Sequence, residues 1–329
     1  MQPFSLERLP EKVLWLLEEG FFAYFGTADL KGSPHVTPVT FVFDGESIFT
    51  VTSKFSRKIR NLRENPKAAV LIDVRDPENL QNNWAVLLRG EAKIYGVKDF
   101  LAEFRRIVKV NRLIRGKYPK YFEYYMREWK RLPKAWKPCL FRSRLIVRFD
   151  PKEYVYMRET MPTRLDGGTL NFQGFLRESS FAYLCTVEKD GMPHVVPIFF
   201  HYDEGEGSLW TLSPARSRKI ANLKVNRKAC LTIDVRDPVN PANNRGVMVR
   251  GEAFLHEACS SLEKLKRFMG GQIYRSFQEK YPFFEEWLCR TLGFPLVPVE
   301  IAVEKAVCWR GTFFQAFKLP RKTLTMPPA

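Results

Sequence analysis

The chain has 329 residues, enough for two domains of ordinary size that each bury a core. Its 45% apolar and 14% aromatic residues are typical of a globular protein, and no stretch is long and apolar enough to span a bilayer. The N-terminal sequence lacks the order of a signal peptide, so we expect a cytoplasmic protein without a membrane partner. The net charge of +17 is compatible with several anionic partners and selects none of them.

A hairpin is predicted at the start of the first half of the chain. Residues 21–27 and 34–43 are rich in β-branched and aromatic residues, and a turn that contains Gly32 separates them. The period becomes helical after Ser56, and Asn65-Pro66 ends that helix. The other predicted elements of this half are strands over 47–52, 67–74, 84–96 and 143–150 and helices over 97–114 and 119–132.

The second half repeats these signals. Residues 22–44 align without a gap on residues 181–203, and after a two-residue insertion the match resumes through SRKI, DVRDP and RGEA. About half of the aligned positions are identical, which indicates a tandem duplication of a whole domain. Pro, Gly-Gly and polar residues in the stretch 158–173 predict the boundary, so we place the domains at 1–159 and 160–329.

The strand pattern predicts the fold class. Each half has six or so short strands with turns at close intervals and few helices. This organisation favours a mainly β fold, an antiparallel β-barrel with flanking helices, over a parallel α/β sheet. In the second half the flanking helices are expected over 260–277 and 282–292, before a last strand over 299–309.

The heptapeptide SRKIRNL at residues 56–62 recurs as SRKIANL at residues 217–223. Each copy stands where the third strand of its half leads into a helix, and a helix N-terminus favours an anion through its unpaired N–H groups and its dipole. Serine, arginine and lysine add a hydroxyl, a fork of donors and a point charge for phosphate oxygens. The pattern predicts two phosphate sites, and the alternative is an ordinary serine N-cap on a solvated helix.

The stretch from Pro34 to Asp73, PHVTPVTFVFDGESIFTVTSKFSRKIRNLRENPKAAVLID, resembles the FMN-binding split β-barrel proteins of the pyridoxamine 5'-phosphate oxidase-like superfamily. The resemblance covers each half from the first strand through RGEA and, more loosely, the helices and the last strand. It implies two tandem split β-barrel domains. Family members are usually homodimers with two flavin sites at the interface, so the resemblance further implies an intramolecular dimer with pseudo-two-fold symmetry.

The resemblance also assigns residues to two cofactor sites. The phosphate ligands of the family correspond to the Arg-Lys pair of each heptapeptide, and the edge of the flavin ring follows the backbone of the second strand. A small hydroxyl residue before the heptapeptide and an aromatic-basic pair in the last strand complete each site. The expected residues are Thr52, Ser53, Ser56, Arg57, Lys58, Pro38, Val39 and Thr40, then Ser213, Ser217, Arg218, Lys219, Pro197, Ile198 and Phe199, with Trp309 and Arg310 from the last strand.

Two features depart from the pattern of the family. The first half carries Tyr156-Met157-Arg158 where the second half carries Trp309-Arg310, and this is a weaker match. A glutamine that some members place in the fifth strand against the ring falls near Ala85 and Gly246, so that contact is absent.

Equivalent histidines, His35 and His194, raise the possibility of a catalytic role or a haem ligand. Neither has a carboxylate or nucleophile partner that the sequence identifies, so we favour half-exposed strand residues. The DVRDP segments are interpreted as turn formers and caps, because no His or Cys joins their aspartates. We predict no metal site.

The scattered cysteines, which form no CxxC pair, are expected to be reduced core thiols: Cys139, Cys185, Cys230, Cys259, Cys289 and Cys308.

The segment from Arg105 to Arg148 is the most basic part of the chain and interleaves its cations with Tyr, Phe and Trp. This composition would suit nucleic acid. The aromatic residues of 118–131, however, are spaced like the buried stripe of a helix, with the charges directed outward. We therefore favour a solvated helical face over a nucleic-acid partner, with the acidic tail of coenzyme F420 as a third interpretation.

The resemblance implies an FMN-binding oxidoreductase that exchanges a hydride between the flavin N5 and a small-molecule substrate. FMN is the expected cofactor, F420 is the alternative, and haem is favoured least. Flavin chemistry resides in the cofactor, so an acid–base pair is not required. The alternative function is a non-catalytic carrier of flavin or F420, or a nucleic-acid-binding module on the same scaffold.

Overall fold

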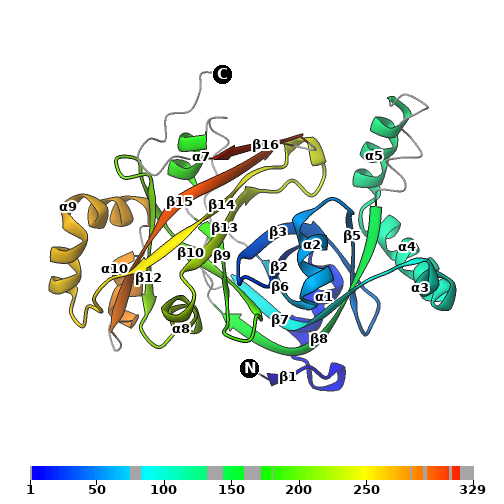
Figure 1. Ribbon diagram of the computed structural model, residues 1–329, viewed down its shortest axis with the longest axis horizontal. Helices are drawn as coiled ribbons and strands as arrows, with labels where there is room; N and C mark the ends of the chain where they lie inside the picture. The colour runs from blue at the N-terminus through cyan, green and yellow to red at the C-terminus, as the bar shows by residue number, and fades with distance from the viewer. Residues whose placement is uncertain are drawn as a thin grey trace.

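The computed structural model describes residues 2–74, 83–131, 144–158, 172–179, 181–281, 284–291, 295–310 and 313–318. Within these ranges the chain forms two curled antiparallel sheets that lie side by side (Figure 1). The mainly β fold and the tandem arrangement are confirmed. The predicted domain boundary at residues 159 and 160 lies outside the described residues and stays a prediction.

The first sheet has the strand order β3-β2-β6-β7-β8-β5-β4, and β1 pairs with β8 beside this path. Strands form here because apolar and β-branched residues alternate or run continuously, so that one face of each strand reaches the barrel core. The strands are β1 (Gln2–Pro3), β2 (Phe22–Ala28), β3 (Pro34–Thr40), β4 (Val42–Phe43), β5 (Ile48–Ser53), β6 (Lys67–Val74), β7 (Trp84–Ile94) and β8 (Arg144–Arg158).

The second sheet has the order β10-β9-β13-β14-β15-β12-β11, which matches the first strand for strand, and β16 adds to the side of β15. The repeat therefore predicted the common topology correctly, while β16 had no counterpart in the prediction. The strands are β9 (Phe181–Val187), β10 (Pro193–Phe199), β11 (His201–Asp203), β12 (Ser208–Pro214), β13 (Lys228–Val235), β14 (Arg245–Leu255), β15 (Leu296–Arg310) and β16 (Phe313–Lys318).

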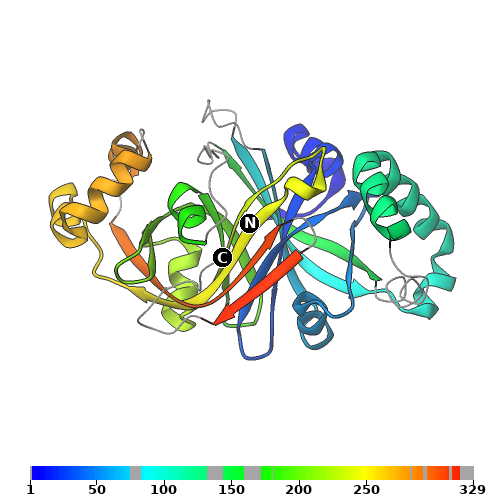
Figure 2. The ribbon, with the colours of Figure 1, turned by 90° about the horizontal axis from the view of Figure 1, so that it is seen from above.

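Helices flank the barrels, with α3–α5 at one end of the molecule and α9–α10 at the other (Figures 1 and 2). The predicted helix over 97–114 is divided at Glu103, whose carboxylate accepts a hydrogen bond from the Tyr95 hydroxyl. The helices are α1 (Glu11–Glu19), α2 (Arg57–Glu64), α3 (Val97–Ala102), α4 (Phe104–Lys117), α5 (Pro119–Arg131), α7 (Phe172–Glu178), α8 (Arg218–Val225), α9 (Leu262–Lys280) and α10 (Phe284–Thr291), with short 3₁₀ turns at Leu6–Arg8 and Pro241–Asn243.

The first sheet has a break at Phe41, between its two edge strands β3 and β4. We predicted one strand over 34–43, but β3 pairs with β2 at one edge of the sheet and β4 pairs with β5 at the other. The Phe41 backbone therefore leaves both ladders, and the Tyr118 hydroxyl accepts from its N–H at 3.0 Å and donates to its carbonyl at 2.7 Å. Tyr281 makes the same pair of bonds to Phe200 in the second barrel, at 2.9 and 2.7 Å.

The two barrels share an apolar interface. Each barrel has its own core, and a third buried cluster takes residues from both halves. Its members are Tyr24, Val36, Ala69, Leu71, Ala85, Leu87, Phe181, Tyr183, Cys185, Val195, Cys230 and Met248. Reciprocal contacts frame this cluster, because the Asn65 amide donates to the Gly191 carbonyl at 3.0 Å and the Asn226 amide donates to the Gly32 carbonyl at 2.7 Å. The halves are thus related as the members of a dimer would be.

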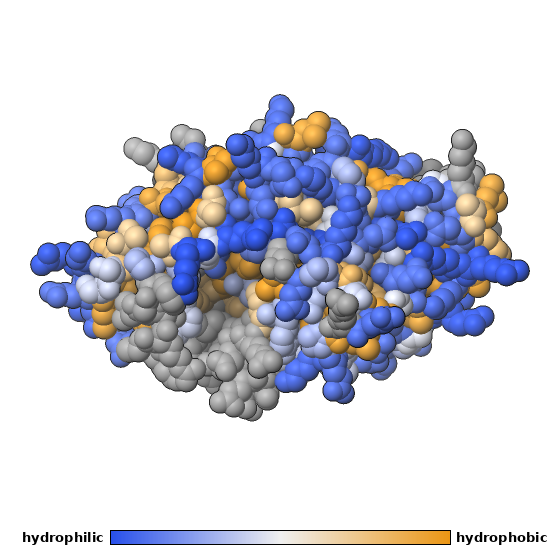
Figure 3. All heavy atoms as spheres, turned by 90° about the horizontal axis from the view of Figure 1, so that it is seen from below, coloured by the Kyte–Doolittle hydropathy of each residue, from blue (hydrophilic) through white to orange (hydrophobic). Residues whose placement is uncertain are grey.

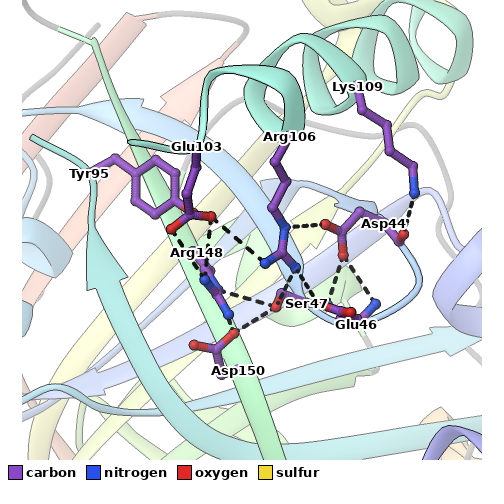
Figure 4. A network of polar contacts seen from close by, with 9 residues as sticks. All are labelled: Asp44, Glu46, Ser47, Tyr95, Glu103, Arg106, Lys109, Arg148 and Asp150. Carbon is purple, nitrogen blue, oxygen red and sulfur yellow. Dashed lines mark hydrogen bonds and ion pairs between the residues drawn. The ribbon is translucent and has the colours of Figure 1, made fainter. Parts of the chain in front are cut away.

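Helix α4 buries Ile107 and Val110, but the buried aromatic stripe predicted on α5 is wrong for most of its described length: Tyr121 is 4% exposed, whereas Phe122 and Tyr125 are 40% and 44% exposed. Part of the charge of α4 is engaged in ion pairs and hydrogen bonds. Arg106 donates to Asp44 at 2.5 Å and to Ser47 at 3.0 Å, and Lys109 donates to the Asp44 carbonyl at 2.7 Å (Figure 4). These bonds fasten α4 to the turn between β4 and β5. Residues 132–143 of the predicted basic segment lie outside the described residues.

Among the residues that Figure 3 colours, hydrophilic side chains predominate on the face seen from below, with smaller hydrophobic patches between them. Of the helices that the structure describes, none combines the length and the apolar character needed to cross a membrane.

Candidate cofactor sites at two helix N-termini

Helix α2 begins directly after the third long strand of the first barrel. Ile59 and Leu62 fall at helical spacing and are buried in the barrel core, which fixes the orientation of the helix. Ser56 is the N-cap residue, but its side chain makes no capping hydrogen bond. The interpretation of Ser56 as an ordinary capping serine is therefore wrong for its hydroxyl, which lies 3.5 Å from Thr52 Oγ1 instead.

Lys58 lies at the centre of the first site. Its side chain is only 7% exposed, and Nζ donates to Thr52 Oγ1 at 3.4 Å. No ion pair involves Lys58 within the described residues. Burial, followed by the positive charges of Arg236 and Arg144, lowers the pKa of Lys58 to about 8. A buried cation beside two further cations is an arrangement that an anion would stabilise.

Arg57, unlike Lys58, has a carboxylate partner. Its guanidinium forms an ion pair with Asp29 at 3.1 Å, and its Nε is buried without a hydrogen-bond partner in the described part of the chain. An anion at the α2 N-terminus would compete with the Asp29 carboxylate for this guanidinium. Ser53, the last residue of β5, pairs with Arg144 across the sheet.

The second site repeats the arrangement at the start of α8. Ser217 is the N-cap, again without a capping hydrogen bond, and its Oγ is buried and has no partner among the described residues. The same is true of Ser213 Oγ. Burial lowers the pKa of Lys219 to about 8, and Arg218 forms an ion pair with Glu188 at 2.9 Å. Unsatisfied buried hydroxyls beside a lysine are suited to phosphate oxygens.

The backbone predicted to follow the ring lies on edge strands. Among the strands that the structure describes, residues 38–40 of β3 pair with β2 alone, and residues 197–199 of β10 pair with β9 alone. The other edge of β3 faces the second barrel, where the Thr232 hydroxyl donates to the Val36 carbonyl at 2.7 Å. Strand β3 therefore reaches the second barrel at Val36, whereas Val39 and Ile198 of the predicted segments are buried in the cores of their own barrels.

Trp309 fills the space that a fifth-strand glutamine would need. It packs against the shared interface cluster and pairs with Gly246 across β14 and β15. A Cβ atom added at Gly246 would lie 2.3 Å from Trp309 Cζ2, so this position accepts only glycine beside the indole. The Arg310 side chain lies outside the described residues.

The two equivalent histidines are buried, so the expectation of half-exposed residues is wrong. His35 is 5% exposed and His194 is 8% exposed, because β3 and β10 lie at the interface and not at a free surface. Burial and nearby cations, Lys58 foremost, lower the pKa of His35 well below its ordinary value. Burial and the charge of Lys219 lower the pKa of His194 to about 3. Both rings are neutral near pH 7.

Several site residues were missed by sequence reasoning. Arg236 belongs to the second DVRDP segment, where Asp234 forms an ion pair with it. Arg144 begins the last strand of the first barrel and carries no motif. The repetition of DVRDP was the available signal for Arg236, but its aspartates were interpreted as turn formers. Asp237 does cap a turn, since it accepts from the N–H groups of Val239 and Asn240.

Two curled barrels with an interface between them and a cationic helix N-terminus in each define a tandem split-barrel protein. A sequence profile described as pyridoxamine 5'-phosphate oxidase matches residues 9–121 and 169–289, so the chain belongs to this family.

Individual relatives are more distant. A 5a,11a-dehydrotetracycline/5a,11a-dehydrooxytetracycline reductase from Streptomyces rimosus is 32% identical over 81 residues, which is 24% of this chain. The match spans 57% of the length of that relative. The heme storage protein HutZ from Vibrio cholerae aligns over 47% of this chain and 97% of its own, with 17% identity and a TM-score of 0.35. An F420 reductase aligns over 45% of this chain and 98% of its own, with 24% identity and a TM-score of 0.30.

Proposed function

We propose that the protein is an FMN-binding oxidoreductase with a cofactor site at each of the helices α2 and α8. The observation that carries the proposal is Lys58, a buried lysine at a helix N-terminus that no carboxylate neutralises within the described residues. A phosphate group would supply the missing negative charge and accept from the backbone N–H groups of the first helical turn. Membership of the pyridoxamine 5'-phosphate oxidase family supports this assignment.

The proposed ligands follow the geometry of each helix start. In the first site the phosphate would contact Lys58, Arg57 and the hydroxyls of Thr52, Ser53 and Ser56, while the ring would lie along residues 38–40. In the second site the corresponding groups are Lys219, Arg218, Ser213 and Ser217, with the ring along residues 197–199. Trp309 and Arg310 would border a ring from the last strand of the second barrel.

A bound flavin supplies the hydride chemistry, and the chain contributes binding, orientation and exclusion of water. The Streptomyces relative is named as a reductase, which supports a redox reaction on a small organic substrate. The neutral histidines lie near the cationic clusters without adding charge to them, so the positive charge is provided by lysine and arginine alone.

The first test is an absorption spectrum of the freshly purified protein, followed by mass determination of any compound released on denaturation. Twin flavin bands and released FMN would support the proposal. A deazaflavin band would replace FMN by F420, and a Soret band would replace it by haem. A colourless protein that binds neither FMN nor F420 when they are added would overturn the flavin assignment.

A pair of variants locates the site. Lys58→Ala together with Arg57→Ala should weaken FMN retention at the first site by a few kcal/mol, about 100-fold in affinity, because charge-assisted phosphate bonds are lost. Arg63→Ala is the matched control, since Arg63 is an exposed cation in the last turn of the same helix. Unchanged flavin content in the double variant would show that Arg57 and Lys58 do not bind the cofactor phosphate.

A further inference from the structure

The two helix sites differ at the strand that faces them. In the first barrel β5 ends on Ser53, which is paired with Arg144 of β8. At the equivalent position of the second barrel β12 ends on Pro214, which is paired with Leu296 of β15. The positive charge of Arg144, which acts on Lys58, therefore has no counterpart beside Lys219, because the buried Leu296 stands in its place.

A second difference lies on the helices themselves. Arg60 is exposed on α2, one turn after the N-cap, and its positive charge is felt at His35. The equivalent residue of α8 is Ala221, which is also exposed. Because neither position is buried, packing does not dictate the choice between arginine and alanine.

The third difference concerns the arginine that each half directs toward the site of the other half. Arg89 of the first barrel is buried between Glu153 at 3.2 Å and Glu188 at 3.0 Å, so its charge is neutralised beside the second site. Arg250 takes the equivalent place beside the first site. It is paired across the strands with Lys305, where Arg89 has Glu153, and it forms no ion pair within the described residues.

All three differences make the first site more positively charged than the second. The first site gains Arg144, Arg60 and an arginine without a carboxylate partner in the described ranges, whereas the second site has Leu296, Ala221 and an arginine held by two glutamates. The equivalent of Arg236 is Arg75, which lies outside the described residues. Like charges gathered around one site destabilise the free protein, and a multiply charged anion would relieve their repulsion.

We propose that the duplicated sites have diverged, so that the site at α2 binds anions with several ionised groups tightly and the site at α8 binds them weakly. The ligand class is a cofactor or substrate that carries a diphosphate, or a phosphate together with further acidic groups. This proposal rests on the proposed cofactor function for the identity of the ligand, but the inequality of the two anion sites does not depend on flavin.

The test is a calorimetric titration of the full chain with inorganic pyrophosphate and, separately, with FMN. Two classes of site that differ by about tenfold or more in affinity are expected, and the tighter class should weaken more steeply with salt. Arg60→Ala with Arg144→Leu should weaken only the tight class, by about tenfold. Ala221→Arg adds the missing charge to the weak site at an exposed position and should strengthen it several-fold.

Arg63→Ala serves as the matched control, because it removes an exposed cation from the far end of α2. Equal affinities at the two sites, or equal weakening of both by the double variant, would overturn the proposed divergence. If FMN binds equally at both sites, the flavin assignment stands and the divergence fails. If pyrophosphate shows two classes that respond to the variants while FMN does not bind, the divergence stands and the flavin assignment fails.

Discussion

The hydroxyl of Tyr24, on β2 of the first barrel, donates a 2.7 Å hydrogen bond to Oδ1 of Asp234 at the end of β13 in the second barrel. Tyr183 of the second barrel donates in the same way to Asp73 of the first, and the two tyrosine rings stack on each other. The carboxylate of the first aspartate in each DVRDP segment thus accepts a hydrogen bond from a tyrosine hydroxyl of the opposite barrel. These bonds fix the relative position of the barrels, and so the distance between α2 and the second-barrel cations.

Removing one of these hydroxyls should destabilise the interface. Tyr24→Phe is expected to lower the free energy of unfolding by about 1 to 2 kcal/mol, because a buried bond to a carboxylate is lost while Asp234 keeps its pairing with Arg236. Tyr183→Phe should have a similar effect. Urea denaturation measures the change, with Tyr125→Phe as a control at a side chain that is 44% exposed. Equal stability of all three variants would show that the bonds contribute nothing.

The break at Phe41 gives a local prediction. Tyr118→Phe leaves the N–H and carbonyl of Phe41 without their shared partner in a buried place, which should cost about 1 to 3 kcal/mol. Amide hydrogen exchange should become faster at Phe41 and stay unchanged at Phe200, where Tyr281 makes the equivalent bonds. Faster exchange at both residues would indicate that the barrels open together.

Acid should weaken the attachment of α4. Burial alone would raise the pKa of Asp44, but the bonds from Arg106 and from the N–H groups of Ser47 and Glu46 outweigh it and lower the pKa below the ordinary value. A carboxyl with a lowered pKa in the folded state contributes stability above its unfolded pKa, and this contribution is lost as the pH falls through the folded pKa. Thermal unfolding from pH 6 down to pH 2 measures the loss.

Asp44→Asn should remove that part of the acid dependence and lower the stability at pH 7 by about 1 to 3 kcal/mol. The control is Asp203→Asn, because Asp203 caps the equivalent turn of the second barrel and has no arginine partner in the described ranges. A greater loss in the Asp203 variant than in the Asp44 variant would contradict the role of Arg106.

Anion binding at the first site should depend on pH through Lys58. Its pKa is lowered to about 8 by burial and by Arg236 and Arg144, so the free protein loses this charge as the pH rises from 7 to 9. FMN affinity at the first site is expected to fall by about tenfold over this range, since the phosphate is already fully ionised. Lys58→Arg should bind without this dependence because arginine stays protonated. An equally steep decline in Lys58→Arg would assign the titration to another group.

The amino-acid sequence determined the repeat, the mainly β fold and the start of each site helix. These features depend on residues close together along the chain: alternating apolar residues, a Gly-containing turn, and the change of period after Ser56. The same local signals located the strand-to-helix junctions that carry Ser56-Arg57-Lys58 and Ser217-Arg218-Lys219. Resemblance then named the family, which the profile match confirms.

Tertiary structure alone decided which distant residues meet. The break at Phe41 lets β3 and β4, which are consecutive in the chain, lie at opposite edges of one curled sheet, whereas local propensity favours an unbroken strand there. The cationic cluster joins Lys58 to Arg144 and Arg236, which come from a later strand and from the other barrel. The buried state of His35 likewise depends on the second barrel covering an edge strand. Such contacts are set by barrel closure and docking, which depend on the packing of whole faces and not on neighbours in the sequence.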